Sequence, residues 1–270
     1  MAELDTGPHR LHYEIIDLTP PWVEAPETIL FHHGVGANGR CWLGWAPALL
    51  ARYRLVAFDL PGHGQSPDDD GAITISSMVH DVIALTDAVD CAQFHMVGES
   101  IGGTVALQVA IEHPVRLRSL TVSNGAHKGG AVQNVDFWRE VIEDEGMAAW
   151  SDRMMLARFF DNALPAPAQA WYRAQQAGAD PVTVLALLAA LVGTDLSRQL
   201  SEITIPTLLL HPDSSPFIPV PLMAELHGQL VNSRLRIFPN TRHGLPFSHA
   251  CECSRTLLQF LDGVAVQSKL

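Results

Sequence analysis

The stretch QFHMVGESIGG, residues 93–103, decides the fold of this chain. A short apolar run leads into Gly98-x-Ser100-x-Gly102, and a helix-forming stretch over 104–112 follows at once, which predicts a strand, a sharp turn and a helix. Gly98 and Gly102 have no Cβ, so the strand and the helix can approach closely around the turn. Ser100 is then held at a strained tip with its hydroxyl exposed, a geometry typical of a nucleophilic serine.

Length, charge and composition exclude several classes of protein. The chain has 270 residues, a length at which α/β folds often form one core with an insertion. The formal net charge is −12, so nucleic-acid binding is not expected, because phosphate contacts need basic patches. No apolar run approaches the ~20 residues that span a bilayer, and residues 1–5 do not resemble a signal peptide. We therefore expect a cytoplasmic protein with a small-molecule partner and no membrane partner, as a monomer or homodimer.

Strands and helices alternate along most of the chain. Short apolar runs bounded by turn residues predict buried strands, amphipathic stretches between them predict helices, and residues 11–16 predict an antiparallel edge strand. This alternation indicates an α/β fold with a mostly parallel sheet covered on both faces. The predicted buried strands are 28–33, 54–60, 94–97, 117–123, 207–211 and 234–238, and the helices are 42–52, 73–89, 103–112, 220–230 and 250–261.

One segment interrupts the alternation. Residues 130–200 contain no convincing strand and predict short helices over 135–145, 147–160, 166–177 and 181–191. We expect this insertion to be a helical cap over the site, and residues 1–129 and 201–270 to form the core domain. Acidic residues outnumber basic ones in the cap, so it is not a general anion trap, although one of its arginines could hold a carboxylate. These arginines include Arg139, Arg153, Arg158 and Arg173.

Two loops flank the predicted nucleophile. The first loop is His32-His33-Gly34-Val35, which follows the first central strand. In esterase-type sheets, a backbone N–H of this loop and the N–H of the residue after the nucleophile together form the oxyanion hole. Val35 and Ile101 are the expected donors. The two histidines lack metal-ligand spacing and are expected to shape the loop. The second loop, DLPGHGQS at 59–66, is expected to be a rigid turn with internal hydrogen bonds, in which Asp59, His63 and Ser66 have structural roles.

The general base is expected late in the chain. On a sheet of this kind the order is Ser, acid, His, and Asn240-Thr241-Arg242-His243-Gly244 follows the last predicted strand. A neutral imidazole at His243 can take the Ser100 proton and return it to the leaving group.

These motifs together resemble the α/β-hydrolase superfamily. They are the elbow at 98–102, the His33-Gly34 loop, the turn at 59–64 and the late His243, and the resemblance covers nearly the whole chain. A finer similarity, in the cap stretch 137–149, is to bacterial 3-oxoadipate enol-lactonases and relatives, which hydrolyse lactones, esters and related bonds in aromatic-compound breakdown. The resemblance implies an α/β-hydrolase fold, with a mostly parallel central sheet flanked by helices and a helical cap insertion, and neither a metal nor an organic cofactor.

The acid departs from the family's pattern. Members usually carry G-x-x-D-x-x-x-P after the penultimate strand, and aligning the proline on Pro219 puts Ser215 at the acid position, while Asp213 lies two residues too early. The other position that some relatives use corresponds to Asn124. Three interpretations stay open: Asp213 reaches His243 through a rearranged loop, Asn124 or Ser215 orients the imidazole as a neutral partner, or no orienting group is present.

The expected function is that of a serine hydrolase, with Ser100 attacking an ester or enol-lactone-like carbonyl in aromatic or heterocycle catabolism. One alternative is a C–C bond or amide hydrolase of a ring-cleavage product, and another is a non-catalytic or slow-turnover receptor for a small ligand. The residues expected to line the substrate pocket are His33, Gly34, Trp42, Trp138 and Arg139.

Overall fold

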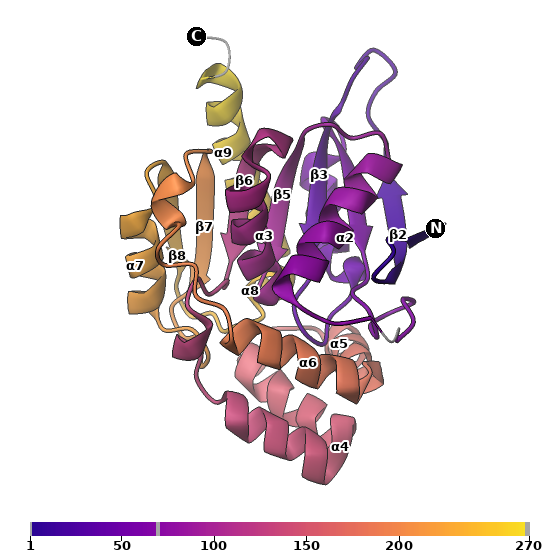
Figure 1. The fold of residues 1–270 in the computed structure, drawn as a ribbon, viewed down its shortest axis with the longest axis vertical. Coiled ribbons are helices and arrows are strands. Elements are labelled where there is room, and N and C mark those ends of the chain that lie inside the picture. Colours follow the sequence, from indigo (N-terminus) through magenta and orange to yellow (C-terminus); the bar gives the residue numbers. More distant parts are fainter. Residues whose placement is uncertain (1, 69–70, 268–270) are drawn as a thin grey trace.

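The computed structural model describes residues 2–68 and 71–267, and an eight-stranded sheet forms its centre (Figure 1). The strand order is β1-β2-β4-β3-β5-β6-β7-β8; β2 pairs antiparallel with β1 and β4, and the remaining pairs are parallel. The mostly parallel sheet confirms the predicted fold class. The strands are β1 (Ala2–Asp5), β2 (Arg10–Ile16), β3 (Glu27–His32), β4 (Tyr53–Phe58), β5 (Phe94–Glu99), β6 (Leu117–Ser123), β7 (Thr207–Pro212) and β8 (Ser233–Phe238).

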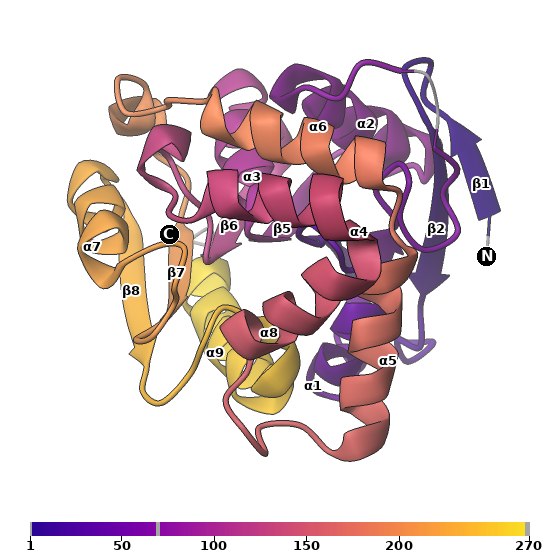
Figure 2. The same ribbon diagram turned by 90° about the horizontal axis from the view of Figure 1, so that it is seen from below.

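Helices cover both faces of the sheet (Figure 2). One face carries α2 and α3, and the other carries α1 and α9. The helices on each face pack over the central strands and share one apolar cluster, which differs between the two faces. Because both faces are covered, β3, β5 and β7 are almost wholly buried, as their continuous apolar runs predict. The helices of the core are α1 (Ala46–Leu49), α2 (Ile75–Ala88), α3 (Ile101–Glu112), α7 (Val220–Gln229), α8 (Leu245–Ser248) and α9 (Ala250–Gln267).

The sequence prediction was wrong in two places at the edge of this core. β2 was predicted as the edge strand, but β1 pairs with it and takes that place. β1 is four residues long and mostly exposed, so it has no apolar alternation to reveal it. The helix predicted over 42–52 is instead a 3₁₀ segment, Gly39–Trp45, followed by the single turn α1.

The cap is helical, as predicted, and lies at the carboxyl edge of the parallel strands (Figures 1 and 2). It consists of α4 (Val135–Arg158), α5 (Ala166–Gly178) and α6 (Pro181–Val192). α4 contains a kink at Gly146, whose φ of 83° divides it close to the predicted boundary between two helices. In the described part of the chain no single helix is long and apolar enough to cross a membrane; only α5 and α6 together pass that test, across a bend of 88°.

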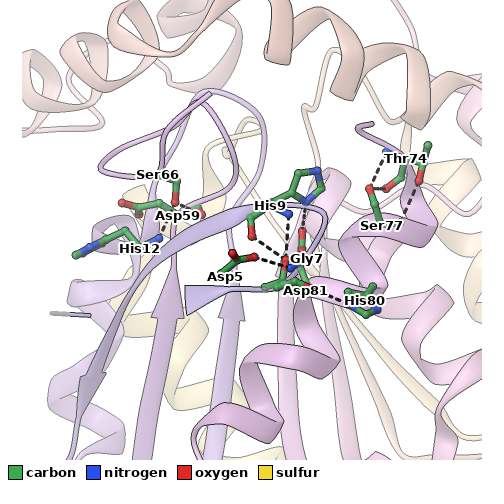
Figure 3. Close-up of polar contacts among 11 residues, drawn as sticks. Asp5, Gly7, His9, His12, Asp59, Ser66, Thr74, Ser77, His80 and Asp81 are labelled. Carbon is green, nitrogen blue, oxygen red and sulfur yellow. Dashed lines mark hydrogen bonds and ion pairs between the residues drawn. The ribbon is translucent and has the colours of Figure 1, made fainter. Parts of the chain in front are cut away.

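A buried polar cluster fastens the N-terminal hairpin to α2 (Figure 3). One oxygen of Asp81 accepts a hydrogen bond from the Thr6 hydroxyl at 2.6 Å, and the other lies 2.6 Å from His9 Nδ1. His80, on the same helix, contacts the Thr6 carbonyl oxygen at 2.8 Å. These contacts fix the β1–β2 hairpin at the edge of the sheet against α2.

The turn after β4 has the internal hydrogen bonds that its sequence predicts. Asp59 accepts from the backbone N–H groups of Gly39 and Gln65, at 2.7 and 2.8 Å. Ser66 Oγ donates to the Asp59 carbonyl at 2.7 Å and accepts from His12 N at 2.8 Å, as Figure 3 shows. Asp59 and Ser66 are therefore structural, and they hold the turn rigidly beside the loop that follows β3.

Candidate active site

Ser100 occupies a strained turn between β5 and α3. Its φ and ψ of 57° and −120° are unusual for a residue with a side chain, and its N–H donates to the Ser123 carbonyl at 2.9 Å. A Cβ at Gly98 would collide with the backbone of Gly102, and one at Gly102 would collide with His32. Both glycines are thus required by close backbone approach, as the motif predicts.

Ser100 and His243 line the same cavity between the core and the cap. Its volume is about 40 Å³, enough for only a few water molecules. Arg158 and Gln133 are the other polar residues of the wall. The remaining wall is apolar and comprises Val35, Ala126, Val132, Val135, Trp138, Trp150, Met154, Leu188, Leu191, Phe217 and Ile218. The predicted nucleophile and base therefore share a small, mostly apolar site.

The partner of the His243 imidazole is Ser215. Ser215 Oγ lies 3.1 Å from His243 Nδ1, and it also accepts long hydrogen bonds from Phe217 N and Ile218 N, at 3.4 and 3.3 Å. The Phe217 ring packs edge-on against the imidazole, with ring centroids 4.7 Å apart. A hydroxyl thus stands where a carboxylate is usual, and it orients the ring without supplying negative charge.

Asp213 does not orient His243, so the first assignment of the acid is corrected. Its carboxylate accepts from Asn240 N at 2.8 Å and Thr241 N at 3.1 Å, and from the Ser214 hydroxyl at 2.9 Å. The carboxylate is bound into the start of the histidine loop, which it stabilises from the solvent side. The two-residue offset of Asp213 in the sequence therefore places its carboxylate away from the His243 ring, and the loop does not rearrange to bring the two together.

Asn124 contacts the backbone of the histidine loop and not the ring. Its Nδ2 donates to the His243 carbonyl at 2.7 Å, and its Oδ1 is buried without a partner among the described residues. Asn124 has a φ of 55°, which asparagine tolerates better than most residues. Of the two neutral candidates, Ser215 is the one that contacts the imidazole.

Burial keeps His243 neutral. Desolvation lowers its pKa well below the usual value of 6.5, and the positive charge of Arg158 and nearby His211 lower it further. A neutral imidazole is the form that accepts a proton from serine. No carboxylate among the described residues contacts the ring, so a protonated His243 is less stabilised than the histidine of a Ser-His-Asp arrangement.

The loop after β3 holds consecutive peptide groups in place through buried histidines. His32 Nδ1 donates to the His33 carbonyl at 2.9 Å, and His33 Nδ1 donates to the Gly34 carbonyl at 2.8 Å. His33 Nε2 accepts from Leu60 N at 2.8 Å, while His63 Nε2 accepts from Gly36 N at 3.0 Å. Because accepting nitrogens must be unprotonated, both rings work as neutral imidazoles; burial lowers the pKa of His33 well below its usual value and that of His63 to about 4.

Val35 N–H is left free by this arrangement. The peptide group it belongs to is fixed through the Gly34 carbonyl, which also accepts from Ala37 N at 3.2 Å. Neither Val35 N–H nor Ile101 N–H donates to any of the described residues. A Cβ added at Gly34 would lie 2.9 Å from the Ser100 Cβ, so the loop runs directly beside the predicted nucleophile. The geometry is compatible with the expected oxyanion hole.

Of the predicted pocket residues, Trp138 alone lines the cavity. Trp42 is a core residue stacked on Phe31 with ring centroids 4.9 Å apart, because the apolar face of the 3₁₀ segment packs on the sheet. Arg139 is half exposed and pairs with Asp136. His33 and Gly34 lie behind the cavity wall, where they shape the loop.

Sequence reasoning missed the importance of Glu99 and Arg158. Both side chains are buried, and Arg158 Nη1 lies 3.5 Å from Glu99 Oε1. Burial raises the pKa of Glu99, whereas Arg158 and the Gly34 N–H lower it in part. The elbow position of Glu99 carried no signal of a role in the sequence. Arg158 was one of several cap arginines, and only the packing of α4 separates it from its exposed neighbours.

Within the described ranges, no three His, Cys, Asp or Glu side chains are grouped so that they could hold a metal ion. A larger polar cleft of about 410 Å³ lies beside β2 and α5 and contains neither Ser100 nor His243. Its most prominent charges, Arg40 and Glu14, are paired at 2.9 Å. The small cavity is therefore the place in this structure where Ser100, His243 and Val35 meet.

Comparisons with known proteins agree with this geometry. A family model described as the alpha/beta hydrolase family matches residues 29–256. The chain is 28% identical to the putative carbamate hydrolase RutD of Variovorax paradoxus (strain S110), covering 94% of this chain and 97% of that protein. It is also 28% identical to 3-oxoadipate enol-lactonase 1 of Acinetobacter baylyi, over 72% of this chain and 74% of that protein. The solved enol-lactonase of Burkholderia xenovorans LB400 superposes with a TM-score of 0.89 at 21% identity, over 97% of this chain and all of that one.

Proposed function

The chain belongs to the alpha/beta hydrolase family, and on that premise we propose that it hydrolyses an ester or lactone bond of a small, uncharged carbonyl compound. The observation that carries the proposal is the strained Ser100 turn, which opens into the same cavity as a buried neutral His243. The similarity to enol-lactonases supports an enol-lactone or related ester from aromatic or heterocycle catabolism as the natural substrate.

The reaction proceeds in two steps. Ser100 Oγ attacks the carbonyl carbon while its proton passes to His243 Nε2, and the N–H groups of Val35 and Ile101 bind the oxyanion. The tetrahedral intermediate expels the alcohol or enol oxygen, which takes the proton from His243 and leaves an acyl-serine. Water then gives a proton to His243 and attacks the acyl carbon, and the carboxylic acid product and free Ser100 are formed when that proton returns to the serine oxygen.

The wall of the cavity supports this substrate class. The groups that surround Ser100 are mostly apolar, and the charge of Arg158 is opposed by Glu99, so no unpaired charge is available for an anionic substrate. Its volume suits a short acyl group in the closed state. The neutral partner of His243 favours esters and lactones over amides, because an oxygen leaving group depends less on a stabilised imidazolium than an amine does.

A fluorophosphonate probe and a substrate panel test the proposal. We expect covalent labelling at Ser100, abolished in Ser100→Ala, and turnover of short aryl esters and enol-lactones that exceeds turnover of matched carbamates and amides. Preferential turnover of carbamates or amides, for which the RutD similarity is a specific indication, would replace the ester assignment. A folded wild-type enzyme that is neither labelled nor active on the panel would overturn the nucleophilic role of Ser100.

A second function, binding of a small ligand with slow turnover, is favoured by one observation. Ser215 gives the imidazole no negative partner, so acylation and deacylation are both slowed. Kinetics with substrate in excess over enzyme distinguish the two functions. A hydrolase releases many equivalents of product per enzyme over repeated cycles, whereas a receptor binds the compound tightly and stops after one acylation or none.

A further inference from the structure

One cap residue contacts all three loops around the predicted nucleophile. Arg158 ends α4, with a side chain that is 2% exposed. Its Nη2 donates to the Val35 carbonyl at 2.6 Å, and its Nη1 lies 3.5 Å from Glu99, beside Ser100 in the sequence. Its backbone carbonyl accepts from Gly244 N, directly after His243, at 2.9 Å. Arg158 thus joins the cap to the oxyanion loop, the elbow and the histidine loop at once.

These contacts bracket the free amide of Val35. On one side, Gly34 lies against the Glu99 carboxylate, because a Cβ added at Gly34 would fall 2.3 Å from Glu99 Oε2, and the Gly34 backbone lowers the pKa of Glu99. On the other, the peptide group between Val35 and Gly36 is held at its oxygen by Arg158 and at its N–H by His63. Because each peptide group is planar, fixing both neighbours leaves the Val35 N–H little freedom to turn. The bracket therefore restrains the unpaired Val35 N–H next to Ser100.

We propose that Arg158, opposed by Glu99, is a positioning residue for the oxyanion hole, and that docking of the cap completes the hole. The inference rests on the proposed function of Ser100. The core supplies the contact at the Gly36 N–H through His63, but among the described residues the contact at the Val35 carbonyl comes from α4. When the cap is docked, the hole is formed; when α4 moves away, the loop loses that contact and the Val35 N–H can turn from the reacting carbon.

The bonding of the guanidinium argues against a role as an anchor for a substrate anion. Nη2 is bonded to Val35, and Nη1 lies 3.1 Å from the Tyr172 hydroxyl and near Glu99. Nε is the nitrogen that is buried without a partner among the described residues. A substrate carboxylate would have to compete with Glu99 for the charge, whereas a positioning role uses the contacts that already exist.

Two substitutions of Arg158 separate these roles. Arg158→Met keeps much of the volume and removes every polar contact of the side chain, while the backbone contact to Gly244 stays; Arg158→Lys keeps the charge with a single donor group. For a neutral aryl ester, we expect Arg158→Met to lower kcat about 10- to 100-fold with KM changed less than about threefold, because misplacing a transition-state donor costs rate more than ground-state binding. Arg158→Lys should recover part of the loss. Arg153→Met, which removes a part-exposed arginine of the same helix, is the matched control and should behave as wild type.

Binding of a boronic acid adds a readout that a merely structural role would not move. The boron accepts an electron pair from Ser100 Oγ and becomes a tetrahedral anion, so its affinity reports the oxyanion hole. We expect this affinity to fall in Arg158→Met by the same factor as kcat/KM. Substrate affinity in a Ser100→Ala background should not change when Arg158→Met is added.

The outcomes are distinct. Unchanged kcat and boronate affinity in Arg158→Met would overturn the proposal, as would a rise in KM confined to carboxylate-bearing esters, which would make Arg158 an anion anchor. If Arg158→Met does not fold, Arg158→Lys and Glu99→Gln carry the test, with an expected kcat loss of about threefold to tenfold each. Wild-type enzyme that fails to react with a fluorophosphonate would overturn the function of Ser100 itself, whereas labelled wild type with unaltered variants would overturn only the role of Arg158.

Discussion

The two loops beside Ser100, the oxyanion loop after β3 and the histidine loop after β8, differ in how completely hydrogen bonds fix their groups. In the oxyanion loop, successive peptide groups are fixed by His32, His33 and His63 and by the cap, and a single N–H is left free beside the serine. In the histidine loop, the carboxylate of Asp213 accepts hydrogen bonds from backbone N–H groups, and Nδ1 of the His243 ring contacts the Ser215 hydroxyl instead of a carboxylate. Under the proposed mechanism, the contrast means that the fold prepares stabilisation of the transition-state charge more completely than activation of Ser100.

Filling the space beside Gly34 should have the largest effect. A Cβ at this position meets the Glu99 carboxylate and the Ser100 Cβ, so Gly34→Ala must displace the oxyanion loop. We expect kcat/KM to fall at least about 10³-fold, near the loss on removing one oxyanion donor. Steady-state kinetics on an aryl ester measure the change. Gly130→Ala, where an added Cβ meets no atom within 4 Å, is the control, and near-normal activity of a folded Gly34→Ala protein would contradict a strictly positioned loop.

Restoring a carboxylate to the histidine loop should have the opposite sign. Ser215→Asp places an anion next to His243 Nδ1, in reach of two backbone N–H groups that suit a carboxylate. Because the anion stabilises the imidazolium and the productive tautomer, we expect kcat/KM to rise about 10- to 100-fold, part of the ~10⁴ that a lost aspartate costs elsewhere.

The pH profile sharpens this second prediction. In the wild type the acidic limb of kcat/KM should lie below pH 6.5, since burial lowers the pKa of His243. In Ser215→Asp the limb should move to higher pH, because the carboxylate favours the protonated ring. Ser214→Asp is the matched control, one residue away and bonded to Asp213. Equal activity and equal pH profiles in both variants would show that the hydroxyl at Ser215 already suffices.

Most of the fold, and the two central residues of the site, were predictable from the sequence. Ser100 and its glycines follow from local backbone geometry, and His243 follows from its place after the last strand. Ser215 and Asp213 were only alternatives, because a shift of two residues in a loop changes which side chain reaches the ring and no periodic pattern records it. Arg158 and Glu99 were not predictable in their roles, since their pairing depends on how α4 packs on the core.

Acid should destabilise the oxyanion loop together with the whole fold. Burial lowers the pKa of His32, His63 and His211 to about 4, against 6.5 when unfolded. Between these values the unfolded chain binds more protons than the native one, so stability is full above pH 6.5 and falls as pH decreases toward 4. Each such histidine contributes a slope of about 1.4 kcal/mol per pH unit within this window. Urea unfolding at pH 5 and pH 7 measures it, and equal stabilities would refute the assignment of buried neutral rings.

The smallest effect is expected at Asp213, and it tests the comparison most directly. Asp213 is exposed, and its carboxylate accepts from Asn240 N and Thr241 N. Although desolvation raises its pKa, these N–H groups and the Ser214 hydroxyl lower it overall, as befits an anion with a structural role. Asp213→Asn keeps an acceptor oxygen for the loop, so kcat/KM should change less than about threefold, against the ~10⁴ expected if this were the acid of the triad. A loss of 10³ or more, measured on a folded variant, would show that Asp213 reaches His243 during the reaction. The contact between Ser215 and His243 would then belong to an open state of a complete triad.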